Sequence, residues 1–146
     1  MQDLEWSLAY LLLDREGWAD VPARPGVYRI RAFAEKGGPL PIARAGGVDR
    51  EGILHIGKAN DLRRRIRLFC RAAQGLRAPH HAGGEYARWH FDRLVPRERL
   101  RFDYLVVPDE QRALTLERTL HEEYRERFLD RPPLDGTSGQ TRHQVT

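Results

Sequence analysis

Glu117 stands at a position where a helical pattern predicts an apolar side chain. A helix is predicted from Pro108 to Phe128, and its apolar arc consists of Ala113, Leu116, Leu120, Tyr124 and Phe128. Glu117 projects between Tyr124 and Phe128, inside this arc. A carboxylate that faces a core needs a cation, a metal ion or a network of hydrogen bonds. An ion pair with one of the many arginines and a metal site would both meet that need.

Arg65 breaks the pattern of another predicted helix in the same way, with the opposite charge. Asn60 or Asp61 can cap a helix that runs to Ala73, and its apolar face consists of Leu62, Ile66, Phe69 and Ala73. At about 100° per residue, Arg65 lies about 60° from Leu62 and therefore beside this face. An arginine there must extend its guanidinium into solvent or bind an anion.

The composition predicts one soluble globular domain with an affinity for anions. The chain has 146 residues, of which 40% are hydrophobic and 32% charged, with a net charge of +4. Of its 25 basic residues, all but Lys36 and Lys58 are arginine, the side chain that binds phosphate through a planar fork of donors. These arginines indicate a nucleic-acid partner, or only a GC-rich genome.

Other classes of protein are excluded by simple features of the chain. The single cysteine, Cys70, excludes an internal disulfide and a cysteine-based zinc finger. The longest apolar run, around residues 11–13, is too short to span a bilayer, and the acidic N-terminus does not resemble a signal peptide. We therefore expect a cytoplasmic protein with no membrane contact, as a monomer or a homodimer.

The pattern of elements predicts a small α+β fold, with a three-stranded, mostly antiparallel sheet flanked by helices. Leu4, Leu8, Leu11 and Leu12 predict an extra N-terminal helix over residues 3–15. The other predicted elements are strands at 26–33, 52–57 and 101–107, a surface loop at Lys36–Gly47, and helices at 61–73, 85–91 and 108–128. The chain then divides into a helical extension (1–21), a main domain (22–136) and a tail (137–146).

Taken together, several short motifs resemble those of the GIY-YIG nuclease superfamily, most of all its bacterial excision-repair members. The segment Gly26–Tyr28 matches the first tripeptide, and His55–Gly57 matches the second and leads into Lys58. In the family pattern an arginine follows the second tripeptide by eight residues, and Arg65 holds that place. Glu117 matches the glutamate that the family carries on a later helix. The resemblance covers roughly residues 22–135 and implies this family's fold.

The resemblance also implies the roles of the site residues. Glu117 would hold one divalent cation, Mg²⁺ or Mn²⁺, and Arg65 would bind the scissile phosphate. Tyr28 would act as general base or orient the attacking water, and Lys58 would help because nearby positive charge favours a tyrosinate. His55 would act as a base, relay a proton or donate a hydrogen bond.

This sequence departs from the family pattern at two positions. His55 replaces the tyrosine of the second tripeptide, and Asp135 stands where the family often has asparagine. These changes leave open whether His55 replaces or assists Tyr28, and whether Asp135 substitutes for the asparagine. They also motivate an alternative to the enzyme, a nucleic-acid-binding module that has kept the fold.

The expected function is metal-dependent hydrolysis of DNA phosphodiester bonds, with RNA a less favoured substrate. The resemblance implies the family's usual products, a 5′-phosphate and a 3′-hydroxyl. Further contacts to nucleic acid are predicted for Arg63, Arg64, Arg67, His81 and Tyr86. Sequence preference would have to come from the loops at 36–47 and 80–88, from a partner or from DNA structure, or would be absent. A third reading is an adaptor subunit whose arginines bind an acidic protein.

Overall fold

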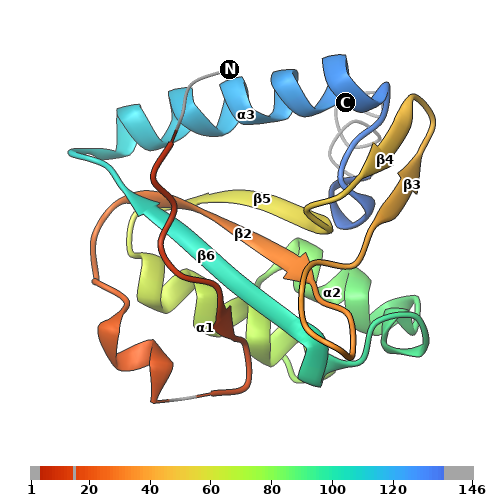
Figure 1. Cartoon of the computed structure of the whole chain (residues 1–146). Coiled ribbons are helices and arrows are strands. Elements are labelled where there is room, and N and C mark those ends of the chain that lie inside the picture. The colour runs from red at the N-terminus through yellow and green to blue at the C-terminus, as the bar shows by residue number, and fades with distance from the viewer. Residues whose placement is uncertain (1–3, 15, 137–146) are drawn as a thin grey trace, which may run out of the picture.

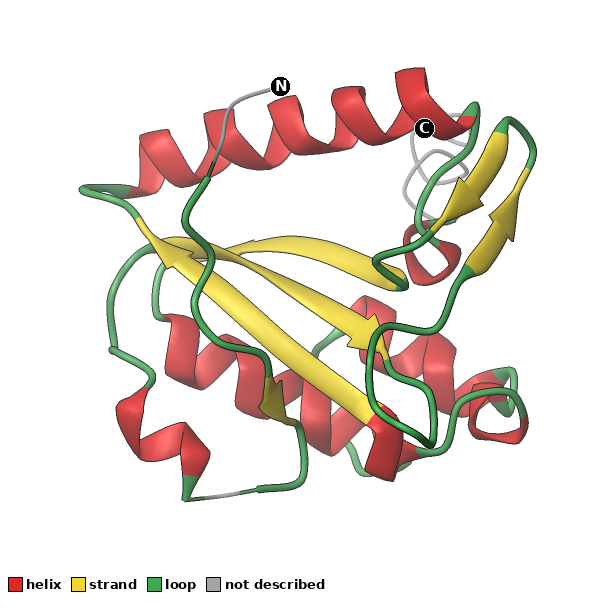
Figure 2. Ribbon diagram, in the orientation of Figure 1, coloured by secondary structure: helices red, strands yellow, loops and turns green. Residues whose placement is uncertain are grey.

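The computed structural model describes residues 4–14 and 16–136, and the predicted tail at 137–146 lies outside these ranges. The fold is α+β and has three layers (Figures 1 and 2). A four-stranded antiparallel sheet, in the order β1-β6-β2-β5, lies between the helix α3 on one face and the helices α1 and α2 on the other. The predicted class is confirmed, whereas the prediction of three strands is wrong because a short edge strand adds a fourth.

The three long strands are those that the sequence predicted. They are β2 (Gly26–Ala32), β5 (Ile53–Ala59) and β6 (Leu100–Val106). The central strand β2 pairs antiparallel with both neighbours, so that Tyr28 lies opposite Gly57 on β5 and Tyr104 on β6. Because β5 is an edge strand, half of its backbone groups point away from the sheet and need partners elsewhere.

The predicted N-terminal helix is wrong for the described residues 4–14, none of which is helical. Two of them form β1 (Tyr10–Leu11), which pairs with the edge of β6, and the short 3-10 helix η1 (Gly17–Asp20) follows. Leu12 is 1% exposed and Leu8 is 78% exposed, so the leucines do not share one buried face. The free backbone edge of β6 offers this segment hydrogen bonds that override its helical spacing.

The predicted surface loop at Lys36–Gly47 is partly wrong as well, because it contains a strand. A two-stranded hairpin, β3 (Ile42–Arg44) and β4 (Gly47–Asp49), stands beside the C-terminal end of α3 (Figure 1). The Asp49 carboxylate is buried and accepts hydrogen bonds from the Ile53 N–H and the Tyr124 hydroxyl. The hairpin is therefore fixed to β5 and α3.

The helices begin at the capping residues that their sequences contain. Asp61 caps α1 (Leu62–Ala73), and Asp109 caps α3 (Glu110–Phe128), each through a side-chain oxygen that accepts a backbone N–H. The short helix α2 (His81–Arg88) begins before the predicted residue 85, because the His80 side chain caps it. The remaining 3-10 turns are η2 (Phe91–Arg93), η3 (Arg97–Arg99) and η4 (Pro133–Asp135).

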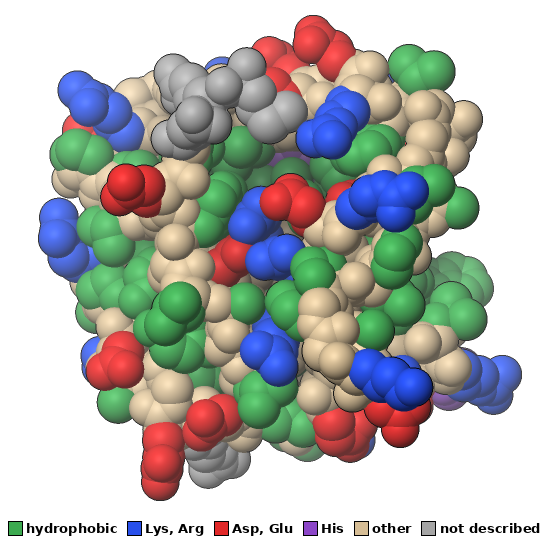
Figure 3. Space-filling model, in the orientation of Figure 1, with side chains coloured by type: hydrophobic (Ala, Val, Ile, Leu, Met, Phe, Trp, Pro, Cys, Tyr) green, Lys and Arg blue, Asp and Glu red, His purple; other side chains and the backbone are tan. Residues whose placement is uncertain are grey.

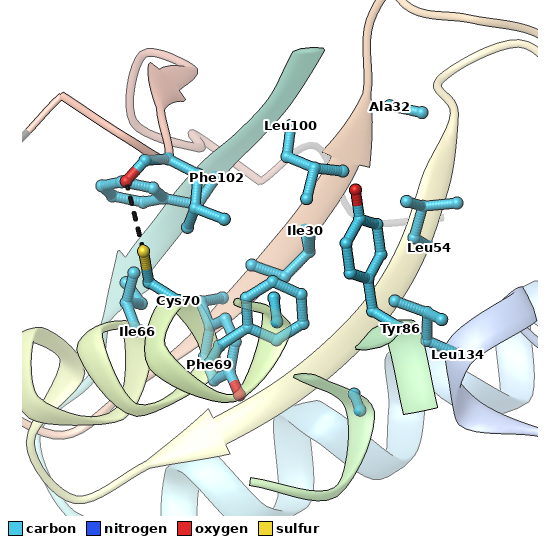
Figure 4. Close-up of a cluster of buried hydrophobic side chains, with 14 of the residues drawn as sticks. Ile30, Ala32, Leu54, Ile66, Phe69, Cys70, Tyr86, Leu100, Phe102 and Leu134 are labelled. Atoms are coloured by element: carbon cyan, nitrogen blue, oxygen red, sulfur yellow. Dashed lines mark hydrogen bonds between the residues drawn. The ribbon is translucent and has the colours of Figure 1, made fainter. Parts of the chain in front are cut away.

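The sheet buries apolar side chains on both faces. The larger cluster, between the sheet and α1 and α2, includes Ile30, Phe69 and Phe102, and its packing is seen in Figure 4. A smaller cluster of Val27, Ile56 and neighbouring residues packs against α3. On the face of the molecule seen in Figure 3, acidic and basic side chains are interspersed and form no single basic patch. Among the described residues, no helix is long and apolar enough to cross a membrane.

Candidate active site

The five side chains that the sequence predicted as catalytic line one pocket of about 390 Å³. The pocket lies where β5 ends and α1 begins, and one side is formed by α3. Its lining residues are Tyr28, His55, Gly57, Lys58, Ala59, Asn60, Asp61, Arg64, Arg65 and Glu117. Three distant segments of the chain thus contribute a phenol, a guanidinium and a carboxylate to the same site.

The exposed edge of β5 positions two acidic side chains. The Lys58 N–H donates to Glu117 Oε2 at 2.8 Å, and the Ile56 N–H donates to Asp135 Oδ2 at 2.8 Å. His121, one helical turn after Glu117, hydrogen bonds to the Ile56 carbonyl at 2.9 Å. The outward-facing groups of the strand are satisfied by side chains from α3 and η4 in place of another strand. Glu117 is therefore held at the pocket by backbone, which the helical pattern alone could not indicate.

Tyr28 lines the pocket and is fully buried. Its hydroxyl is 3.0 Å from His55 Nε2, and the two rings meet edge to face. They can approach because Gly57, opposite Tyr28, has no side chain: an added Cβ would lie 2.6 Å from His55 Nε2 and 2.8 Å from the Tyr28 hydroxyl. This contact between Tyr28 and His55 thus requires a glycine at position 57, the third residue of the second tripeptide.

His80 and Asp135 belong to the same cluster, although neither was predicted as a site residue. His80 Nε2 is 2.6 Å from the Tyr28 hydroxyl, and His80 Nδ1 accepts the Gly83 N–H at 3.2 Å. Asp135 Oδ1 makes a short hydrogen bond with His55 Nδ1. His55 and Asp135, the two departures from the family pattern, are therefore hydrogen bonded to each other.

Burial controls the ionisation of this cluster. It raises the pKa of Tyr28, a shift that the positive charge of Arg65 opposes and the negative charges of Asp135 and Glu117 reinforce. Burial also lowers the pKa of His80 to about 2, and the neighbouring side chains of His55, Arg65 and His81 lower it further. At neutral pH Tyr28 is a protonated phenol and His80 is a neutral imidazole.

Arg65 lines the pocket and is partly buried. Its Nη1 donates to the Pro79 carbonyl at 3.1 Å, its guanidinium also contacts the Tyr28 hydroxyl, and no carboxylate of the described residues forms an ion pair with it. The structure thus rules out mutual neutralisation of Arg65 and Glu117 as the reason for their positions. A guanidinium without a carboxylate partner remains able to bind an anion.

The donor set suits a hard divalent cation with few protein ligands. No group of three or more His, Cys, Asp or Glu side chains among the described residues could enclose a metal ion, and Glu117 faces the pocket from α3. Mg²⁺ commonly binds through one or two carboxylates and retains several waters. A single glutamate at an open pocket fits that habit and does not fit a closed zinc site.

The predicted nucleic-acid contacts do not all lie at this pocket. Arg64 lines it, whereas Arg63 and Arg67 line a separate groove of about 600 Å³ along α1. Arg63 donates to the carbonyls of Val21 and Ala19, so part of its role is to hold the N-terminal segment. The larger groove has no carboxylate or tyrosine among its described lining residues, so we place the chemistry at the smaller pocket.

The predicted nucleic-acid contacts of Tyr86 and His81 stand differently against the structure. The prediction that Tyr86 touches nucleic acid is wrong, because its ring is 1% exposed and its hydroxyl donates to the Val95 carbonyl at 2.6 Å. Its helical neighbours face the core, and this overrides the polar character of the segment. His81 is exposed at the start of α2, 3.9 Å from Glu85, and its predicted contact stays a prediction.

Of three comparisons with known proteins, only the search of solved structures found a match. No protein-family model matches the sequence, and no curated protein matches it. Among solved structures the chain is similar to the GIY-YIG N-terminal endonuclease domain of UvrC from Thermotoga maritima, bound to its catalytic divalent cation, magnesium. The sequence identity is 23% and the TM-score 0.43, over 82% of this chain and 92% of that domain.

Two point mutants of the same domain, each bound to its catalytic divalent cation, match with a TM-score of 0.44 and 23% identity. They cover 82% of this chain and 92% and 91% of the respective domains. The likeness is one of fold, and the assignment of the site rests on the geometry described above.

Proposed function

We propose that this chain is a metal-dependent endonuclease of the GIY-YIG type that hydrolyses phosphodiester bonds in DNA. The observation that carries the proposal is the convergence of Tyr28, Arg65 and Glu117 on one pocket from β2, α1 and α3. Phosphodiester hydrolysis needs an activated water, positive charge at the phosphoryl oxygens and help for the leaving oxygen. The pocket offers groups for the first two of these needs.

Glu117 and Arg65 supply the electrostatic part of the reaction. Glu117 is the residue that would hold one divalent cation, Mg²⁺ or Mn²⁺, which stabilises negative charge on the phosphoryl group when bound. The Glu117 Oε2 to Lys58 N–H hydrogen bond orients the carboxylate. The Arg65 guanidinium binds a phosphate oxygen, because it has donors to spare and no carboxylate partner in the described part of the chain.

Tyr28 is the group that receives the proton of the attacking water. Its buried hydroxyl stays protonated at neutral pH, since burial raises its pKa, and it must lose that proton to act as a base. The positive charge of Arg65 favours the tyrosinate. The Lys58 side chain is exposed at the pocket and adds positive charge for the substrate backbone.

Arg64 and Arg67 extend the basic surface of α1 beyond the scissile phosphate. Both are exposed, and one lines the pocket while the other lines the neighbouring groove. Contacts of this kind give affinity without reading base sequence. Specificity then depends on the shape of the DNA, on the β3–β4 hairpin or on a partner.

A panel of linear, nicked, flapped and branched DNA, with Mg²⁺ and with Mn²⁺, tests the function. Wild-type protein should cleave at least one substrate, and Glu117→Ala should not. Equal cleavage by both would place the activity elsewhere or in a contaminant. No cleavage by wild type, with salt-sensitive binding retained, would favour a binding module, and a matched RNA panel tests the preference for DNA.

A further inference from the structure

Four side chains form one chain of hydrogen bonds that passes through the hydroxyl of Tyr28. In order they are Asp135, His55, Tyr28 and His80. They come from η4, β5, β2 and the residue before α2, so the fold assembles the chain from four separate segments. All four side chains are buried or nearly so, with His55 and Asp135 11% and 12% exposed.

The contacts of His80 define the direction of its hydrogen bond. His80 Nδ1 accepts the Gly83 N–H, so in the neutral ring the proton lies on Nε2. Nε2 then donates to the Tyr28 oxygen at 2.6 Å. Because burial lowers the pKa of His80 to about 2, the ring stays neutral and keeps this one donor at working pH. His80 can therefore stabilise negative charge on the Tyr28 oxygen, but it cannot take the proton.

The contacts of Asp135 define the other end of the chain in the same way. One carboxylate oxygen accepts the Ile56 N–H, and the other faces His55 Nδ1. An ionised carboxylate can only accept, so the His55 proton lies on Nδ1 and Nε2 is bare. His55 Nε2 therefore accepts the hydrogen bond of the Tyr28 hydroxyl, which lies at 3.0 Å. Each donor in this series of four hydrogen-bonded side chains therefore has one acceptor.

We propose that Asp135, His55 and Tyr28 act as a proton-relay triad in which His55 Nε2 takes the phenolic proton, while His80 is a positioning residue for the tyrosine oxygen. The proposal rests on the function proposed above. Of the groups that contact the Tyr28 hydroxyl in the described structure, His55 Nε2 alone can accept a proton, because His80 Nε2 and the Arg65 guanidinium are donors.

The step balances in protons and electron pairs. As the water oxygen forms its bond to phosphorus, a water proton moves to the Tyr28 oxygen and the phenolic proton moves to His55 Nε2. The bond from phosphorus to the leaving oxygen breaks, and that oxygen keeps the electron pair and is protonated by solvent. Asp135 stabilises the imidazolium formed on His55, as an aspartate does in serine hydrolases, and the proton later returns to solvent.

The substitution Asp135→Asn tests the triad with little change in shape. Asparagine has one acceptor oxygen, which can serve either the Ile56 N–H or His55 Nδ1, and its amide disfavours the tautomer with bare Nε2. The matched control is Asp130→Asn, which removes a half-exposed ion pair to Arg44 outside the pocket. Thermal melting of both variants shows whether the fold is kept.

The first readout needs neither metal nor substrate. Nitrogen-15 NMR of histidine-labelled protein should show the proton on Nδ1 in His55 and on Nε2 in His80 of the wild type. In Asp135→Asn the His55 proton should move to Nε2 in part or completely, and the control should match wild type. A wild-type His55 that carries its proton on Nε2 overturns the proposal, because it could not accept from Tyr28.

The second readout is the pH profile of single-turnover cleavage. Asp135→Asn should lower the rate by about 10² to 10⁴, the usual contribution of general acid–base catalysis. It should also move the acidic limb of the pH profile to lower pH, because an imidazolium on His55 loses the stabilising charge of Asp135. Other charged or titratable groups facing the cluster are Arg65 from α1, Glu117 and His121 from α3, Lys58 from β5 and His81 from α2.

The outcomes separate the relay from the proposed function. If Asp135→Asn cleaves as fast as wild type and has the same pH profile, the relay is refuted and the proposed nuclease function is not affected. No cleavage by wild type refutes both. If Asp135→Asn does not fold, His80→Phe gives the test. This variant should slow cleavage and leave the His55 tautomer unchanged. His80→Gln keeps a hydrogen-bond donor and should recover part of the cleavage rate.

Discussion

Gly57→Ala should break the contact between Tyr28 and His55 by adding one methyl group. The new Cβ would lie 2.6 Å from His55 Nε2 and 2.8 Å from both Cζ and the hydroxyl of Tyr28. These distances are well below ordinary contact, and neither ring can move freely because both are buried. One or both rings must shift, and the hydrogen bond between them lengthens or breaks.

The expected cost follows from two effects. Overpacking a well-packed interior costs about 1–3 kcal/mol, and leaving a buried polar group without its partner costs about 1–3 kcal/mol. For a domain of this size, each kcal/mol lowers Tm by about 3–4 °C. We expect a Tm at least 5 °C below wild type, together with loss of most cleavage activity, measured by differential scanning calorimetry and a nicking assay.

Gly84→Ala is the matched control for this prediction. Gly84 lies within α2, and a Cβ there meets nothing within 4 Å. Because alanine is the better helix former, this variant should be as stable as wild type or up to about 1 kcal/mol more stable. If Gly57→Ala melts and cleaves like wild type, Tyr28 and His55 do not have the close contact on which the site depends.

Three further predictions concern charge and coupling. Arg64→Ala should weaken DNA binding uniformly and reduce the slope of log K against log salt by about 1, measured by fluorescence anisotropy over a salt series; an unchanged slope would exclude a phosphate contact. Because burial lowers the pKa of His80 in the folded protein, the contribution of this residue to the free energy of unfolding is complete above pH 6.5 and is lost as the pH falls toward 2, by at most about 1.4 kcal/mol per pH unit. Urea unfolding of His80→Gln should therefore show a shallower dependence on acid pH than wild type. Equal slopes would contradict the buried neutral ring. His55→Phe and Asp135→Ala remove two ends of one hydrogen bond, so the double variant should lose less unfolding free energy than the two single losses combined, and strict additivity would show that they act independently.

Patterns local to one element predicted much of the site. Glu117 and Arg65 were identified as charges inside or beside apolar helical faces, and both line the pocket. Signals of this kind depend only on periodicity along one segment.

Contacts between distant segments could not be predicted in this way. His80 follows a proline in an irregular stretch, and only the tertiary fold brings it to Tyr28, 52 residues earlier in the sequence. Asp135 was marked by its departure from a family pattern, but its bond to His55 spans 80 residues. The helix predicted for the N-terminal segment is wrong for the same reason, because the edge of β6 with which this segment pairs lies about 90 residues later in the sequence.

The most direct test of the central claim compares wild type with Glu117→Gln in plasmid nicking and in DNA binding, using the same samples with Mg²⁺. Glutamine can still accept the Lys58 N–H, so the fold should be kept while the charge that would hold a cation is lost. We expect wild type to nick DNA, Glu117→Gln to be at least 100-fold slower, and both to bind DNA similarly. Equal nicking by the two proteins would contradict a phosphodiester-hydrolysing site at this pocket.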